Sequence, residues 1–238
     1  MQFSYSTYKI DYTIEEYPEK RYFFTLALIN ASLSKLEKNA VSFLHPDERK
    51  ELNSYTYNMR RHSFLLGRCA AKIAFNSYNA CQTLESSFQV RNTLMGSPYF
   101  LNKQNHLSLS HSGDYGLAMV GERDHSFAVD IEIKNSSNHL SKEAFEPDEQ
   151  KWLQCFDWSQ DEVMLGLWSI KEALVKLIQT GLTVSMVTLE VKEVTQENKN
   201  RLKVKFKHFH SITGWIIKKE NYILSICLPS KINPCCWN

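Results

Sequence analysis

The sequence predicts an α+β protein, in which helices and antiparallel strands occupy separate stretches of the chain. Apolar residues recur at helical spacing in residues 60–75 and 167–177. Strand-like segments are grouped in residues 107–133 and 184–228. A chain of 238 residues can form one large domain or two halves of about 100 residues each. No low-complexity linker and no evident repeat decides between them.

The first helical stretch has a narrow apolar stripe and a basic face. Leu66 begins an apolar series with steps of four and three residues, whereas Arg61, Arg68 and Lys72 share the opposite side. Either a solvated surface or an anchor for a polyanionic ligand explains these cations. The second stretch has a similar apolar stripe, and Gly181 after it suits the left-handed conformation that ends a helix.

The strand-like segments suggest particular neighbours. Residues 117–120 and 127–133 are separated by a polar link of hairpin length, which predicts an antiparallel pair. Further along, Lys203 and Lys205 alternate with apolar residues, as in a half-buried strand with a basic wet face. A docking site for an acidic partner is the alternative for that face.

Composition indicates an ordinary globular protein. At 43% hydrophobic, 23% charged and a formal net charge of +2, it gives no indication of nucleic-acid or membrane binding. Acidic residues interrupt the first thirty positions, so no secretory signal is visible, and the apolar run 22–29 is too short to span a bilayer. The six cysteines lack C-x-x-C spacing, and Cys235 and Cys236 receive no role. A cytoplasmic protein is expected.

Two carboxylates are expected to lie side by side on one strand. In residues 129–133 the side chains alternate, so Asp130 and Glu132 share the face opposite three β-branched residues. Such neighbours repel each other unless a cation lies between them, and hard oxygen ligands suit magnesium or manganese. A solvated acidic face is the alternative.

A second candidate segment is Trp-Ser-Ile-Lys-Glu-Ala-Leu-Val-Lys at residues 168–176. Glu172 and Lys176 are four residues apart and therefore adjacent on a helix, which by itself indicates only a surface ion pair. The third candidate is residues 107–113, where Ser110 and His111 precede a glycine. This segment suits either a phosphate cradle or a polar turn. No G-x-S-x-G nucleophile elbow is present.

Taken in order, these segments resemble the signature of one family. Residues 110–112, 130–132 and 168–176 are similar to the motifs of the 4′-phosphopantetheinyl transferases of the surfactin-synthetase (Sfp) type. The resemblance covers about residues 40–185 and includes these further segments: 43–49, 64–72, 96–98, 145–153 and 181–182.

The resemblance implies a fold of two similar α+β halves related by a pseudo-twofold axis, with coenzyme A between them. Residues 1–125 would form the coenzyme A-binding half, and residues 126–238 the half with the metal and the catalytic helix. Because the fold is already pseudo-dimeric, a monomer is expected.

The resemblance also implies roles for the acidic residues. Asp130, Glu132 and Glu172 would hold Mg²⁺, with Mn²⁺ as an alternative, and Glu172 would be the general base. Lys176 would be a catalytic residue that contacts the pyrophosphate of coenzyme A.

Three further residues are expected to bind the coenzyme, namely Arg68, Ser110 and His111, with His111 on the 3′-phosphate. The sequence departs from the family at Ser97, where a basic residue is usual. This departure concerns coenzyme affinity rather than reaction type.

The implied enzyme is a holo-[acyl-carrier-protein] synthase. It would transfer the 4′-phosphopantetheine group of coenzyme A to a serine of an apo acyl or peptidyl carrier protein and release adenosine 3′,5′-bisphosphate. The carrier could belong to fatty-acid, polyketide or non-ribosomal peptide biosynthesis. Its docking patch is expected to include Phe145, Trp152 and Leu153. The alternatives are a non-catalytic module that binds a carrier protein or coenzyme A, and a metal-dependent phosphohydrolase.

Overall fold

A computed structural model of the chain describes residues 3–81, 85–134, 140 and 145–237. The chain forms two compact units, of which the first comprises Met1–His125 with Ile232–Asn238 and the second Ser126–Lys231. Both units combine helices with antiparallel sheets, so the α+β class is confirmed. The C-terminal strand belongs to the first unit, although the sequence suggested that it would continue the second half.

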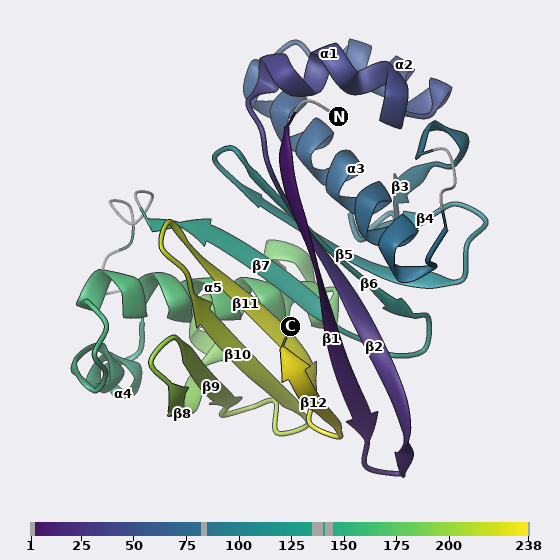
Figure 1. Ribbon diagram of the computed structural model, residues 1–238. Coiled ribbons are helices and arrows are strands. Elements are labelled where there is room, and N and C mark those ends of the chain that lie inside the picture. Colours follow the sequence, from purple (N-terminus) through teal and green to yellow (C-terminus); the bar gives the residue numbers. More distant parts are fainter. Residues whose placement is uncertain (1–2, 82–84, 135–139, 141–144, 238) are drawn as a thin grey trace. The chain divides into compact units, whose positions relative to one another are not determined.

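The first unit is built around a five-stranded antiparallel sheet in the order β12-β1-β2-β6-β5 (Figure 1). Its long β1–β2 hairpin was not among the expected elements. The elements of the unit are β1 (Ser4–Ile14), β2 (Tyr17–Asn30), α1 (Leu33–Phe43), α2 (Pro46–Ser54), α3 (Asn58–Tyr78), a 3-10 turn (Glu85–Ser87), β3 (Val90–Asn92), β4 (Pro98–Phe100), β5 (Asn105–Ser112), β6 (Tyr115–Glu122) and β12 (Ile232–Trp237).

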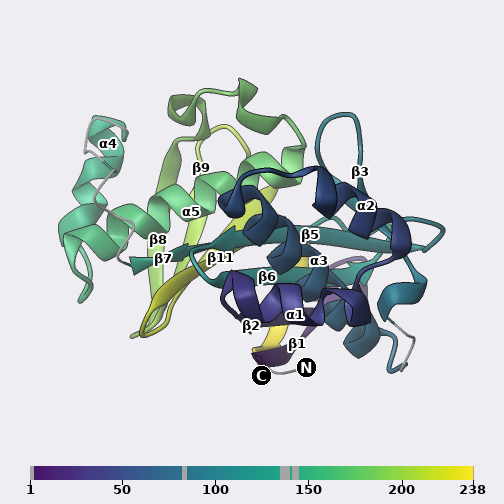
Figure 2. The same cartoon turned by 90° about the horizontal axis from the view of Figure 1, so that it is seen from above.

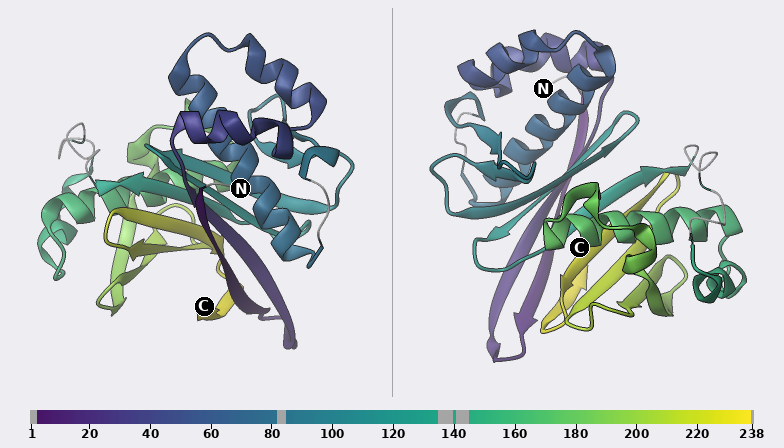
Figure 3. Two further views of the ribbon diagram at one scale, coloured as in Figure 1. Left: turned by 45° about the horizontal axis from the view of Figure 1, so that its top comes forward. Right: turned by 180° about the vertical axis from the view of Figure 1, so that it is seen from behind.

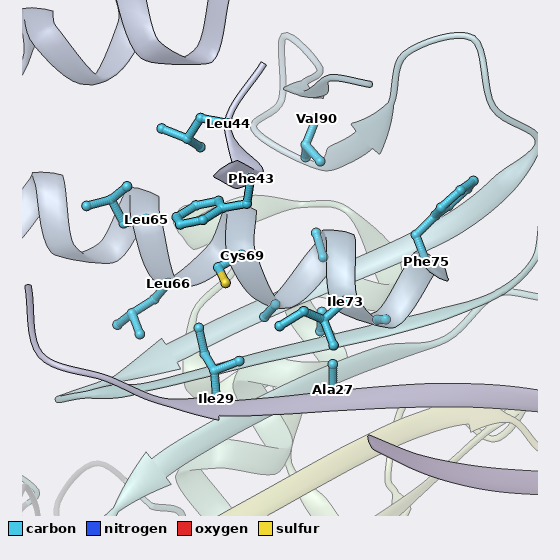
Figure 4. Close-up of a cluster of buried hydrophobic side chains, with 14 of the residues drawn as sticks. Ala27, Ile29, Phe43, Leu44, Leu65, Leu66, Cys69, Ile73, Phe75 and Val90 are labelled. Carbon is cyan, nitrogen blue, oxygen red and sulfur yellow. The ribbon is translucent and has the colours of Figure 1, made fainter. Parts of the chain in front are cut away.

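The core of the first unit lies between α3 and this sheet. α3 packs on β2 and β6. Leu66 and Ile73 point from α3 toward Ile29 and Ala27 of β2 (Figure 4), and all four side chains are buried. The apolar stripe predicted for this helix is therefore confirmed.

The second unit also has a five-stranded antiparallel sheet, in the order β7-β11-β10-β9-β8. α5 lies along one face of this sheet (Figures 2 and 3) and packs on β7, β10 and β11. The elements of the unit are β7 (Ala128–Ile133), α4 (Pro147–Gln150), a 3-10 turn (Lys151–Gln154), α5 (Gln160–Ile178), two 3-10 turns (Gly181–Thr183 and Met186–Leu189), β8 (Val191–Asn198), β9 (Arg201–Phe206), β10 (Ile212–Lys218) and β11 (Tyr222–Pro229).

The two units repeat one order of elements. Both contain a strand, a short helix, a long helix and then four strands, namely β2-α2-α3-β3-β4-β5-β6 and β7-α4-α5-β8-β9-β10-β11, and in the first unit the helix α1 also lies between β2 and α2. In each unit the last strand of the series pairs antiparallel with the first. The chain therefore contains an internal repeat that was not evident from its sequence.

Local predictions were mostly confirmed, with two corrections. The basic strand is as predicted: Leu202 and Val204 are buried, and Lys205 is exposed. The predicted hairpin between residues 117–120 and 127–133 is wrong, because β6 pairs with β2 and β5 whereas β7 pairs with β11. The polar link turns at residues 123–124 and carries the boundary between the units, but it does not join a hairpin.

The end of α5 is the second correction. Gln179 already adopts a left-handed conformation with φ of 55°, two residues before Gly181, which also has positive φ. None of the helices in the described ranges is long and apolar enough to cross a bilayer.

Candidate active site

β7 carries the two acidic residues that the sequence singled out. Asp130 is only 3% exposed, and Glu132 is half-buried. In the sheet, Asp130 lies opposite Ser225 of β11. A buried carboxylate is stable only with hydrogen-bond or charged partners. Asp130 therefore does not belong to a solvated acidic face, which was the alternative explanation of this strand.

Both carboxylate oxygens of Asp130 accept hydrogen bonds from α5. Ser169 Oγ donates to Oδ2 at 2.8 Å, and Lys176 Nζ donates to Oδ1 at 2.7 Å. Lys176 Nζ also donates to the carbonyl oxygen of Val129 at 3.3 Å. The ammonium of Lys176 thus lies against the acidic strand, and these contacts join two of the predicted motifs, β7 and α5, into one site.

Glu172 is the second carboxylate near Asp130. It is half-buried on α5. Burial raises the pKa of Glu172, the charge of Asp130 raises it further, and Lys176 opposes both effects. A carboxyl group whose pKa lies above its ordinary value is a stronger base, and such shifts are typical of catalytic groups.

A capping box holds the start of α5. Ser159 Oγ accepts the backbone N–H of Glu162, and the carboxylate of Glu162 accepts the backbone N–H of Ser159. The same carboxylate accepts hydrogen bonds from Lys134 after β7, at 2.7 Å, and Lys218 of β10, at 3.1 Å. The first turn of α5 is thereby tied to two strands of its sheet.

The acidic residues partly fit the predicted metal ion. Burial and then the charge of Asp130 raise the pKa of Glu172, and two carboxylates that repel each other in this way would be stabilised by a cation between them. Over the described ranges, no group of three or more His, Cys, Asp or Glu side chains converges as a metal cluster would. The role of Glu132 as a third ligand stays a prediction.

The residues expected to bind the coenzyme lie in the first unit. Ser110 and His111 are neighbours on β5, so their side chains point to opposite faces of the sheet. Ser110 is buried, whereas His111 is exposed. Gly113, with φ of 54°, forms the turn that returns the chain into β6. The structure therefore does not bring these two side chains onto one face.

The predicted basic face of α3 is not a solvated surface. Lys72 is fully buried against Glu48, and Arg68 is 5% exposed with its Nε 3.6 Å from a Glu48 oxygen. Arg61 bonds Glu37 and the carbonyl oxygen of Leu52. Both earlier explanations, a wet face and a row of three ligand cations, are wrong for Lys72.

Arg68 itself has an unusual environment. Its Nε has no hydrogen-bond partner within the described part of the chain, and its guanidinium lies 4.6 Å from the centre of the Phe64 ring. Burial lowers the pKa of Arg68, and Glu48 opposes that effect. An incompletely bonded buried cation suits the binding of an anion.

Comparison with known proteins identifies the family. The model of the 4′-phosphopantetheinyl transferase superfamily matches residues 126–227. Holo-[acyl-carrier-protein] synthases of Lactococcus lactis subsp. cremoris and subsp. lactis are each 30% identical over 103 residues, which is 40% of this chain and 87% of theirs. The chain belongs to the 4′-phosphopantetheinyl transferase superfamily. A solved holo-(acyl-carrier-protein) synthase from Bacillus anthracis in complex with CoA (3′,5′-ADP) is 25% identical, covering 42% of this chain and 93% of that chain with a TM-score of 0.37.

The expected enzyme class, a phosphopantetheinyl transferase, is thus confirmed at the level of the superfamily. The matched residues 126–227 lie within the second unit, which contains Asp130 and α5. The Sfp type remains a prediction.

The structure corrects the carrier-docking patch that the sequence predicted. Phe145 and Leu153 are 3% and 4% exposed and belong to the core of the second unit. Trp152 is half-buried and stacks on Phe156, with the ammonium of Lys151 4.9 Å from its ring centre. Of the three residues, Trp152 alone stays a candidate for a carrier contact.

Sequence reasoning missed Ser169, although it touches Asp130. The signal was present in the helical spacing, because Ser169, Glu172 and Lys176 are three and four residues apart and share one face of α5. On this face of α5, only the charged residues Glu172 and Lys176 were predicted as site residues.

Proposed function

We propose that this chain transfers the 4′-phosphopantetheine group of coenzyme A to a serine of an apo acyl or peptidyl carrier protein. The second product is adenosine 3′,5′-bisphosphate. The observation that carries the proposal is the buried Asp130, bonded by Ser169 and Lys176 and coupled to Glu172 within the segment that matches the superfamily.

We assign proton removal to Glu172. Its raised pKa makes it a stronger base than an ordinary glutamate, and it can take the proton of the carrier serine directly or through a water molecule. Magnesium or manganese, held by Asp130, Glu132 and Glu172, would offset the negative charge of the coenzyme's pyrophosphate. The ammonium of Lys176, held by its hydrogen bond to Asp130, would add a positive charge near the pyrophosphate.

Coenzyme binding is assigned to the first unit. His111 is exposed and suits a phosphate contact, and the buried Arg68 has an incompletely bonded guanidinium. Ser110 is buried, so its role is to support β5 or to contact the coenzyme from that side of the sheet.

We also propose that the enzyme is of the Sfp type, monomeric and cytoplasmic. The relatives match 40% of this chain over 87% of their own length, and outside residues 126–227, which the family model matches, the first unit repeats the series of elements with α1 added. A chain with two such units agrees with the two similar halves that the resemblance to the Sfp type implies.

The proposal is tested by following adenosine 3′,5′-bisphosphate with apo carrier protein, coenzyme A and Mg²⁺. Release that requires the carrier and is lost in Glu172→Ala supports transfer. Equal release without a carrier indicates a phosphohydrolase instead. Coenzyme binding without release, across several carriers, indicates a non-catalytic binding module.

A further inference from the structure

Lys171 precedes Glu172 in the motif helix, but its cation is directed into the protein. The residue is 0% exposed. Its Nζ donates to Glu149 Oε2 at 2.7 Å and to the carbonyl oxygen of Met186 at 3.2 Å, and it lies 5.3 Å from the centre of the Phe145 ring. A lysine with these partners cannot reach a ligand without leaving the core.

Glu149 is bonded on both of its oxygens. Oε2, which accepts Lys171, also accepts the backbone N–H of Glu146 at 3.0 Å. Oε1 accepts the backbone N–H of Val191 at 2.7 Å. This arrangement, called here the Glu149–Lys171 clamp, therefore ties α5 to α4, to the start of β8 and to the turn at Met186.

The first unit contains the same arrangement. Lys72 of α3 pairs with Glu48 Oε2, and both residues are 0% exposed. Glu48 Oε2 also accepts the backbone N–H of His45 at 2.8 Å, and Oε1 accepts that of Val90 at 2.8 Å. Lys72 Nζ lies 5.3 Å from the centre of the Phe88 ring. This is the Glu48–Lys72 clamp.

The sequence repeats with the structure. The pattern Pro-Asp-Glu-x-Lys-x-Leu occurs at residues 46–52 and 147–153, and Gly-x-x-x-x-Lys occurs at residues 67–72 and 166–171. In both units the clamp carboxylate and the strand N–H that it accepts are 42 residues apart. Two copies in which the carboxylate has matching partners indicate that the clamp is a feature of the repeated unit itself.

The copies differ at the residue after the lysine. It is Glu172 in α5 and Ile73 in α3, and Ile73 is buried in the core of the first unit. The clamp was thus kept in both units, whereas the carboxylate that interacts with Asp130 is found in the second one. A role shared by both lysines cannot be the chemistry of the acidic site.

We propose that the Glu149–Lys171 clamp sets the rotation and position of α5, so that Ser169, Glu172 and Lys176 meet Asp130. Lys171 is then a positioning residue and not a contact of the coenzyme. The effect of this positioning on catalysis rests on the proposed function, whereas its effect on amide hydrogen exchange in α5 does not.

The test uses the full chain with the double variant Glu149→Gln/Lys171→Met, which leaves no unpaired buried charge. Its matched control is Glu48→Gln/Lys72→Met. Amide hydrogen exchange of residues 169–176 is measured without metal, Mn²⁺ affinity by electron paramagnetic resonance, and kcat and KM for coenzyme A by transfer to a carrier. Should the double variant unfold, Lys171→Arg keeps the buried charge pair and changes only the length and shape of the cation that holds α5.

The Lys171 variants should exchange faster in residues 169–176, bind Mn²⁺ about 10- to 100-fold more weakly and lose kcat by a similar factor. KM for coenzyme A should rise only together with the loss of kcat, because α5 also carries Lys176. The control variant should keep the wild-type exchange in residues 169–176 and the wild-type Mn²⁺ affinity.

Wild-type exchange and Mn²⁺ affinity in a folded Lys171 variant would overturn the proposal. So would a rise in KM for coenzyme A with unchanged kcat, which would make Lys171 a coenzyme contact. If the wild-type protein transfers nothing, the proposed function fails, but the exchange comparison still decides whether the clamp orders α5.

Discussion

Replacing Ser169 with alanine removes a hydrogen bond from the most buried carboxylate of the acidic site. The bond to Asp130 Oδ2 is 2.8 Å long, and both side chains are buried. A hydrogen bond to a charged group contributes about 1.5–3 kcal/mol to stability. We therefore expect Ser169→Ala to lower the free energy of unfolding by about 1.5–3 kcal/mol, and kcat to fall because Asp130 is less firmly held.

Ser225 provides a matched control in the same unit. It lies opposite Asp130 on β11 and is 0% exposed, and its Oγ has no hydrogen-bond partner in the described part of the structure. Ser225→Ala should change stability by less than about 0.5 kcal/mol, or stabilise the protein, since it removes an unbonded polar group. Urea denaturation measures both variants. Equal losses for Ser169→Ala and Ser225→Ala would refute the reasoning.

Three further predictions follow from single residues. Burial, and secondly the charge of Asp130, raise the pKa of Glu172, so its charged form lowers the stability of the fold once the pH exceeds the ordinary pKa of a glutamate. Glu172→Gln should therefore raise the melting temperature of the metal-free protein at neutral pH and lose this benefit in acid, and an increase that is independent of pH contradicts the raised pKa. Trp152→Ala should raise KM for the carrier but not for coenzyme A, and an equal rise in both argues against a carrier contact. A Cβ at Gly166 would lie 2.9 Å from Ile216 Cγ2, so Gly166→Ala should cost about 1–3 kcal/mol. Gly67→Ala, at the repeated position with an ordinary 3.6 Å contact, should be neutral or stabilising in the same denaturation assay.

The sequence predicted elements whose signal is local. The apolar stripe around Leu66 and the alternation around Lys205 each report which face of an element is buried, and both were confirmed. The acidic strand at Asp130 and the motif helix with Glu172 were also found from spacing. Such patterns describe one element at a time, so they carry no information about partners.

What the sequence could not predict depends on tertiary contacts. Lys72 looks like a surface cation because lysine is rarely fully buried, and only the position of Glu48 shows otherwise. The role of Ser169 depends on its hydrogen bond to Asp130, which lies on a strand 39 residues earlier in the chain. The resemblance implied two similar halves, but no repeat was evident in the sequence, because the patterns that recur are as short as residues 46–52 and 147–153.

The central claim is tested most directly by the intact mass of an apo acyl or peptidyl carrier protein after incubation with this protein, coenzyme A and Mg²⁺. The account predicts a gain of one phosphopantetheine group on a serine, abolished in Glu172→Ala and without divalent metal. An unchanged carrier mass across acyl and peptidyl carriers, with coenzyme A bound to the protein, would contradict it.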